Sequence, residues 1–204
     1  MTSAVVLAAG LSTRMGGEPK GLLPFDDRDT FVTRIVRTFV EAGIADVVVV
    51  VGHAADRMRA AIERSGLPAR VVVNRNYEQG QFSSLLAGLD AVDRPGVDAM
   101  LLTLVDAPLF AASTVEAVVG RFESSGAPVV RAVRGSEHGH PVLIARSLFA
   151  AIRACDPEVG AKSVVRGHAS DAGDVPVDDP GAYIDIDTPA EFAALPGLRR
   201  QLGW

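Results

Sequence analysis

The chain has 204 residues, of which 48% are apolar and 5% aromatic, and its formal net charge is −5. This length suits a single domain, residues 1–204, with a sizeable buried core. Scattered basic residues in an acidic chain argue against nucleic acid or an anionic membrane as partner. The lone Cys155 permits no intrachain disulfide, and the apolar N-terminal stretch lacks a basic leader, so we expect a cytoplasmic protein.

Short apolar runs alternate along the chain with segments of helical spacing. The runs predict buried strands at residues 4–8, 47–51, 70–73, 100–105 and 129–133. Apolar residues three and four apart predict helices around residues 31–40, 58–62, 85–89 and 115–122. The Ser-, Gly- and Asp-rich residues 168–179 are predicted to form a long surface loop. The alternation predicts a three-layer α/β fold with a mostly parallel central sheet.

The first predicted strand runs into a glycine-containing loop, residues 10–20, which holds Arg14 and Lys20. Ligands of such sheets bind beyond the carboxyl ends of the strands. Small residues let a phosphate approach the backbone, and a guanidinium with an ammonium could neutralise a polyphosphate. Lys20 is one of only two lysines among 20 basic residues, which favours a specific role. The alternative is an ordinary turn with two solvated basic residues.

Carboxylates follow two other predicted segments. Asp106 emerges from the most apolar predicted strand, where an unpaired charge would be costly. Alternation near the C-terminus places Asp185 and Asp187 on one side of a short extended segment. Asp106 and Asp187 are candidate Mg²⁺ ligands, because this ion prefers oxygen ligands and is bound through one or two carboxylates together with phosphates. The alternative makes each of them a helix cap, with Asp187 in place of Thr188.

Residues 74–85 are predicted to follow a strand and to open a helix. Gln79, Gly80, Ser83 and Ser84 could offer an amide, hydroxyl groups and free helix N–H groups to the edge of a base. Helix capping by either serine is the alternative.

Two histidines, His138 and His140, lie two residues apart without a third soft ligand nearby, so we expect no zinc site. His140 precedes Pro141 and is therefore held extended, where it could touch a ligand.

The chain resembles the nucleotidyltransferases of molybdenum-cofactor maturation, most closely the molybdenum cofactor cytidylyltransferases. The resemblance rests on ordered motifs at residues 7–20 (LAAGLSTRMGGEPK), 74–89 (NRNYEQGQFSSLLAGL), 105–109 (VDAPL), 139–143 (GHPVL) and 185–192 (DIDTPAEF). It implies a Rossmann-like nucleotidyltransferase fold. It also implies transfer of CMP from CTP to the terminal phosphate of molybdopterin, with Mg²⁺ as cofactor and pyrophosphate as the second product.

The resemblance implies roles for individual residues. Arg14, Lys20 and Asp106 would be catalytic, Asp106 and Asp187 would hold the metal, and His140 and Lys162 would contact the acceptor. The nucleotide would be bound by Leu7, Ala8, Ala9, Gly10, Gln79, Gly80, Ser83 and Ser84. Ala9 favours the cytidylyl branch, since guanylyl relatives usually have glycine there. Lys162 stands where the family usually has arginine. The product would pass to a molybdoenzyme or its chaperone.

Other functions remain open on these residues. The first is the same chemistry on another base or acceptor, as in a guanylyl or sugar-phosphate nucleotidyltransferase. The second is a nucleotide-binding module or cofactor chaperone without turnover, against which Lys20, Asp106 and Asp187 argue. A Rossmann dehydrogenase is disfavoured, because the G-x-G-x-x-G pattern is absent.

Overall fold

The computed structural model describes residues 1–203, with the side chain of Arg14 outside that description. In this part of the chain, seven strands form one sheet in the order β3-β2-β1-β4-β6-β5-β7. The strands are β1 Thr2–Ala8, β2 Val47–Val51, β3 Arg70–Val73, β4 Ala99–Leu104, β5 Val129–Arg134, β6 Glu137–Ala145 and β7 Asp174–Pro176. All pairings are parallel except those of β6, which confirms the predicted mostly parallel sheet.

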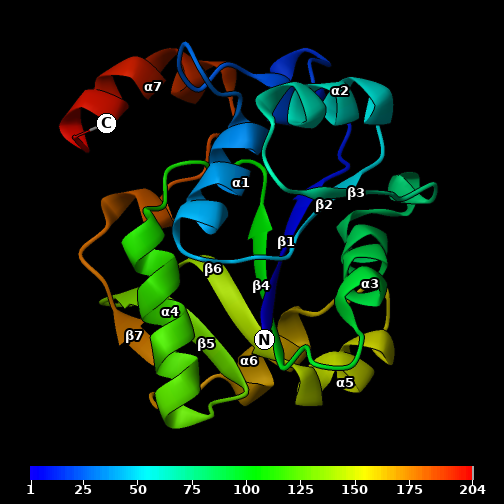
Figure 1. The fold of residues 1–204 in the computed structure, drawn as a ribbon, viewed down its shortest axis with the longest axis vertical. Helices are drawn as coiled ribbons and strands as arrows, with labels where there is room; N and C mark the ends of the chain where they lie inside the picture. The colour runs from blue at the N-terminus through cyan, green and yellow to red at the C-terminus, as the bar shows by residue number, and fades with distance from the viewer. Residues whose placement is uncertain (204) are drawn as a thin grey trace.

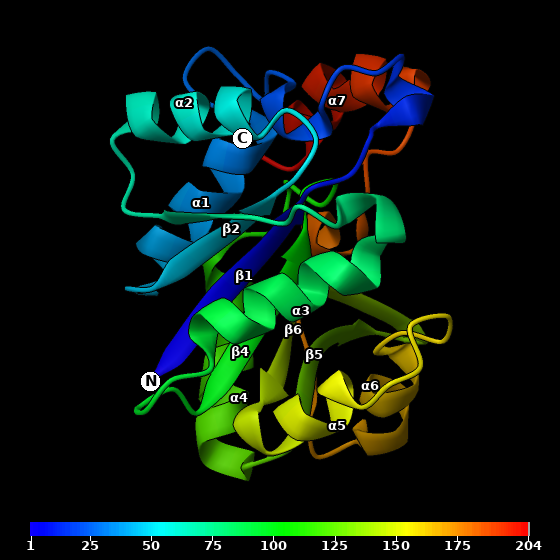
Figure 2. The ribbon, with the colours of Figure 1, turned by 90° about the vertical axis from the view of Figure 1, so that its right-hand side faces the viewer.

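Helices cover both faces of the sheet, as Figures 1 and 2 show. Their bounds are α1 Phe31–Glu41, α2 Ala55–Ser65, α3 Gln81–Val92, α4 Ala112–Ser125, α5 Phe149–Arg153, α6 Lys162–His168 and α7 Pro189–Gln201. Short 3-10 helices are η1 Thr13–Met15, η2 Lys20–Leu22, η3 Tyr77–Gln79, η4 Arg146–Leu148 and η5 Pro180–Tyr183. Among the described residues, no helix has the length and apolar character that crossing a membrane requires.

Two hydrophobic cores, one on each face of the sheet, confirm the three-layer prediction. On one face the core includes residues of α1, α2 and α4, and on the other residues of α3 and α5, with α6 packed against them. The five valines of β2 are at most 1% exposed, as expected for a strand buried on both faces. Gly88 lets α3 approach the sheet, since a Cβ there would lie 2.5 Å from Val5 Cγ1.

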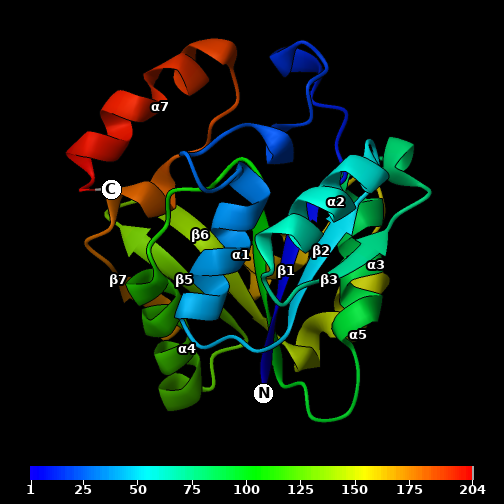
Figure 3. The ribbon, with the colours of Figure 1, turned by 45° about the horizontal axis from the view of Figure 1, so that its top comes forward.

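The carboxyl ends of the parallel strands meet at one end of the molecule. In Figure 1 the β4 arrow points to the end where α2 and α7 lie, while the N-terminus lies at the opposite end. Figure 3 shows the loop after β1 and helix α7 at this same end. A third hydrophobic cluster there joins Leu195 of α7 to Phe25, Phe31 and Ile186.

The prediction of a long loop over residues 168–179 was wrong in part, because this stretch contains β7. The strand has only three residues and pairs in parallel with β5. An ion pair of 2.7 Å between Arg131 Nε and Asp174 Oδ1 supports the pairing. Strand β6 was not predicted either, since its first half is polar and contains Pro141. Both strands depend on their neighbours rather than on an apolar run.

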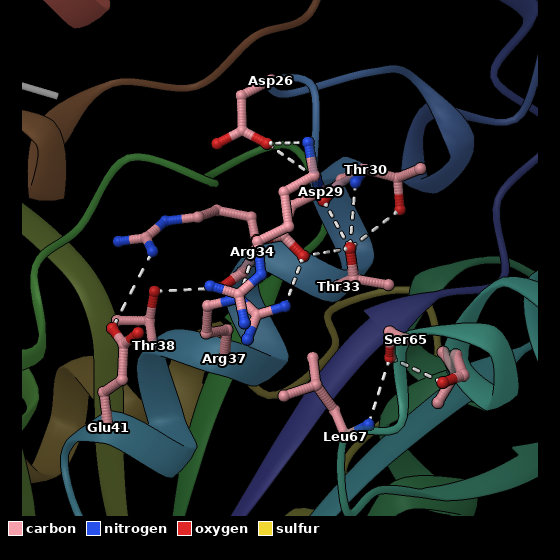
Figure 4. A network of polar contacts seen from close by, with 12 residues as sticks. Asp26, Asp29, Thr30, Thr33, Arg34, Arg37, Thr38, Glu41, Ser65 and Leu67 are labelled. Atoms are coloured by element: carbon pink, nitrogen blue, oxygen red, sulfur yellow. Dashed lines mark hydrogen bonds and ion pairs between the residues drawn. The ribbon is translucent and has the colours of Figure 1, made fainter.

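A polar network fixes the start of α1 and the turn before it (Figure 4). The carboxylate of Asp29 accepts hydrogen bonds from Arg37 Nε at 2.7 Å and from Thr33 Oγ1 at 2.9 Å. Thr30 and Thr33 form a capping box at the helix start. From the other side, Arg199 of α7 donates to the carbonyl oxygen of Phe25 at 2.7 Å. The segment that follows η2, and hence Lys20, is thereby held against two helices.

Candidate active site

A cleft of about 410 Å³ lies beyond the carboxyl ends of β1 and β4. Most of the predicted site residues line it, namely Leu7, Ala8, Ala9, Gly10, Lys20, Gly80, Ser84, Asp106 and Asp187. The sequence analysis did not anticipate that Met58, Tyr77, Glu78 and Gln81 also line it. Segments far apart in the chain therefore meet beyond the carboxyl ends of the strands, where the sequence analysis predicted a site.

Lys20 contacts both predicted metal ligands. Its Nζ lies 2.5 Å from Asp187 Oδ1 and 3.3 Å from Asp106 Oδ2. The lysine side chain is only 12% exposed, whereas those of Asp106 and Asp187 are 19% and 39% exposed. The two carboxylates thus lie close together, as the sequence predicted, but the group between them is the ammonium of Lys20, and their binding of a metal stays a prediction.

The hypothesis that these aspartates are helix caps was wrong. Helix α4 begins after Ala111, and Thr188 caps α7 through a capping box with Glu191. Glu191 Oε2 accepts the backbone N–H groups of Asp187 and Thr188, both at 2.8 Å. These hydrogen bonds, that of Asp187 first, hold the pKa of Glu191 below its usual range. Glu191 therefore fixes the backbone of Asp187, and Asp187 lines the cleft.

The two carboxylates fit a divalent cation that keeps most of its waters. Asp106 Oδ1 is buried and has no hydrogen-bond partner among the described residues. Burying a carboxylate oxygen without a partner costs free energy of folding unless a ligand binds to that oxygen. No cluster of three or more acidic, histidine or cysteine side chains suited to a metal occurs in residues 1–203. This donor set is typical of Mg²⁺ bound through two carboxylates and substrate phosphates.

Asp185 is a third carboxylate near Asp106 and Asp187, and it also interacts electrostatically with His140 of β6. Asp185 is an exposed residue, but the protein around its carboxyl raises the pKa of that group by desolvation; His140 opposes this shift, and Asp106 and Asp187 add to it. His140 itself has a buried Nδ1 without a partner in the described part of the chain. His140 lies in β6, extended as predicted, but does not line the cleft. A polar row thus runs from Lys20 through the aspartates towards His140.

Ser12 shapes the loop after β1. It adopts a left-handed conformation, with φ of 51°, and its Oγ accepts the backbone N–H of Lys20 at 2.9 Å. Its carbonyl oxygen accepts the N–H groups of Met15 and Gly17. Within residues 1–203, no acceptor is found for the N–H groups of Gly10 and Leu11, so both are available to an anion. The predicted side-chain role of Arg14 lies outside the described residues.

Asn74, which the sequence analysis passed over, organises the other wall of the cleft. Its Nδ2 donates to Ser83 Oγ at 2.9 Å and to Ser84 Oγ at 3.0 Å. Neither serine caps α3, whose N-cap is Gly80, so that alternative was wrong. Ser83 and Gln79 lie beside the lining residues rather than among them. The signal for Asn74 was a polar residue directly after a strand.

Tyr77 is packed against the turn that follows β2. A Cβ on Gly52 would lie 2.5 Å from the Cβ of Tyr77, so only glycine permits this contact. The backbone N–H of His53 donates to the carbonyl oxygen of Ala9 at 3.1 Å, which joins the same turn to the start of the loop after β1. The remaining predicted contact, Lys162, begins α6 as an exposed residue and does not line the cleft.

Residues 4–172 match the MobA-like NTP transferase domain. The chain belongs to this family. By its family and its fold it is a nucleotidyltransferase. The general part of the predicted resemblance is thereby confirmed.

Relatives of the chain have diverse names. It is 32% identical to nicotine blue oxidoreductase of Paenarthrobacter nicotinovorans over 200 residues, 95% of each chain. It is 24% identical to molybdenum cofactor guanylyltransferase of Shewanella woodyi over 194 residues, 94% of each. The structure of Rv0371c from Mycobacterium tuberculosis H37Rv is similar at a TM-score of 0.77 and 28% identity, covering 95% of this chain and 96% of that one. Rv0371c has also been solved with manganese, at a TM-score of 0.71, 27% identity and coverage of 95% and 97%.

Proposed function

We propose that this protein transfers CMP from CTP to the terminal phosphate of a molybdopterin-type acceptor and releases pyrophosphate. The observation that carries the proposal is the contact of Lys20 with both Asp106 and Asp187 inside the cleft. The choice of CTP rests on the resemblance and on Ala9, which is 3% exposed and lines the cleft.

Hydrogen-bond donors and cationic side chains of the protein would bind the phosphates, and its carboxylates would bind the metal. The free N–H groups of Gly10 and Leu11 and the ammonium of Lys20 would bind the β- and γ-phosphates, with Arg14 as a further cation. Asp106 and Asp187 would hold Mg²⁺, and the ion would supply positive charge that neutralises the phosphate oxygens. The manganese complex of the relative Rv0371c supports a divalent ion in this family.

The acceptor needs no protein base. Its phosphate is already an anion near neutral pH, so one of its oxygens can attack the α-phosphorus directly. The bond from that phosphorus to the bridging oxygen breaks, and pyrophosphate leaves with the electron pair. Positioning and charge stabilisation then account for most of the catalysis. His140 of β6 and Lys162 of α6 are proposed to contact the acceptor, and a molybdoenzyme or its chaperone would receive the product.

GTP is the second candidate nucleotide, and two observations favour it. The molybdenum cofactor guanylyltransferase aligns over 94% of this chain. In addition, Glu78 lines the cleft, together with Tyr77 and Gln81. A carboxylate accepts hydrogen bonds only, and guanine presents two adjacent N–H donors that suit a bidentate contact.

Pyrophosphate release tests the proposal. The purified protein is assayed with Mg²⁺, molybdopterin and each of the four nucleoside triphosphates in turn. We expect release with CTP and a loss of roughly two to three orders of magnitude in folded Lys20→Ala protein, as for removal of a preorganised charge donor. If GTP is the one triphosphate that gives pyrophosphate release, GTP rather than CTP is the nucleotide substrate. No release with any triphosphate, or unchanged release in Lys20→Ala, would overturn the assignment.

A further inference from the structure

The ammonium of Lys20 occupies the point at which a metal would be held. Its Nζ is 2.5 Å from Asp187 Oδ1 and 3.3 Å from Asp106 Oδ2. Mg²⁺ binds carboxylate oxygens at about 2.1 Å, so an ion on these two oxygens would lie against the ammonium. The two positive charges would repel each other strongly in a cleft where Lys20 is only 12% exposed. The lysine and the metal therefore exclude each other.

The backbone of Lys20 is fixed, whereas its side chain can move away from the two carboxylates. Its backbone N–H is held by Ser12 Oγ at 2.9 Å. The next residue, Gly21, is wedged beside α2, since a Cβ there would lie 2.3 Å from Met58 Cε. The flexible stem of lysine can nevertheless redirect its charge within the same cleft. The free N–H groups of Gly10 and Leu11 mark where an anion would draw it.

We infer that Lys20 excludes free divalent metal from Asp106 and Asp187, so that the site takes the metal together with the nucleotide. The triphosphate would pull the ammonium away from the carboxylates and would supply the further oxygen ligands that the ion needs. Asp106 Oδ1, buried without a partner among the described residues, is then available to the incoming ion. This inference rests on the proposed function, in that the cleft binds a triphosphate.

Metal and nucleotide must consequently bind with positive cooperativity, and the coupling acts equally in both directions. Mn²⁺ serves as the probe, because its electron paramagnetic resonance signal reports free ion directly. We expect the wild-type protein to bind Mn²⁺ at least about tenfold more tightly when a non-hydrolysable CTP or GTP analogue is present. Lys20→Met, with Mn²⁺ alone, should bind the ion at least about tenfold more tightly than wild type.

Arg166→Met is the matched control, since it removes one positive charge from an exposed position on α6. It should leave the affinity for Mn²⁺ alone unchanged, which separates a local effect from one of net charge. Equal wild-type Mn²⁺ affinity with and without the analogue would overturn the inference, even if Lys20→Met failed to fold. So would a folded Lys20→Met protein that binds Mn²⁺ no more tightly than wild type.

The same measurements distinguish this inference from the proposed function. Pyrophosphate release together with Mn²⁺ binding that does not depend on nucleotide would refute the exclusion of metal by Lys20 but would support the proposed transfer reaction. Cooperative binding of Mn²⁺ and the analogue without pyrophosphate release would support the exclusion and remove the transfer reaction.

Discussion

The backbone N–H of Ile186 donates to the carbonyl oxygen of Asp106 at 2.7 Å. This bond attaches the segment before α7 to the end of β4, and Ile186 is buried at 1% exposure. Because side chains alternate along an extended segment, Asp185 and Asp187 then lie on the opposite side from that isoleucine. This backbone hydrogen bond and the buried isoleucine therefore help to set the side of the segment on which Asp185 and Asp187 lie.

Asp106→Asn and Asp187→Asn should each reduce Mg²⁺-dependent turnover severely, and the double variant should lose much less than the product of the single losses. Residues that hold one ion act as a unit, so their effects are not additive. Thr188→Ala is the control, because it removes the true cap of α7 and should cost only about 1 kcal/mol of stability. Turnover against Mg²⁺ concentration, with thermal melts, measures both. Normal metal dependence in the aspartate variants would refute the shared site.

Much of this arrangement could be predicted from the sequence, because it depends on local patterns. The apolar run of β4 placed Asp106 at a strand end, and the loop after β1 placed Lys20 beside it. The role of Asn74 was missed because it depends on hydrogen bonds to residues nine and ten positions away. The packing of Tyr77 on Gly52 joins residues that share no local pattern. Such contacts appear only once the strands are in register.

Ala9→Gly should narrow the preference for CTP over GTP without abolishing nucleotide binding. Ala9 lines the cleft, and removing its methyl group leaves more room for the larger purine. The ratio of kcat/KM for the two nucleotides, compared between variant and parent, is the measurement. An unchanged ratio would show that this residue does not select the base.

Gly52→Ala should weaken nucleotide binding by displacing Tyr77, since the new Cβ would lie 2.5 Å from the Tyr77 Cβ and 2.6 Å from its Cγ. We expect a higher KM for the nucleotide and a loss of roughly 1 to 3 kcal/mol of stability, as for overpacking. Gly120→Ala is the matched control: no atom lies within 4 Å of its Cβ position in α4. It should raise stability by about 0.5 to 1 kcal/mol. A destabilised Gly52→Ala protein with unchanged KM would exclude Tyr77 from the nucleotide site.

Asp29→Asn should make the free energy of unfolding decrease less steeply as the pH falls. Burial raises the pKa of Asp29, but hydrogen bonds from Arg37 and Thr33 outweigh burial and hold it below the usual range. The folded state therefore binds this proton less readily than the unfolded chain. The resulting stability is present above the ordinary carboxyl pKa of about 3.9 and is lost as the pH falls through the folded value.

Asp29 is only 4% exposed, so loss of its carboxylate at neutral pH should cost roughly 2 kcal/mol, typical of hydrogen bonds to a charged group. Asp27→Asn, at an exposed neighbouring position, provides the control. Urea unfolding of both variants and the parent at pH values from 7 down to 3 measures the difference. The parent and Asp27→Asn should lose stability in parallel towards pH 3, whereas Asp29→Asn should start lower and decline less steeply. Parallel declines in all three proteins would show that the Asp29–Arg37 pair contributes nothing to the acid sensitivity, because a group with equal pKa in both states leaves no pH dependence.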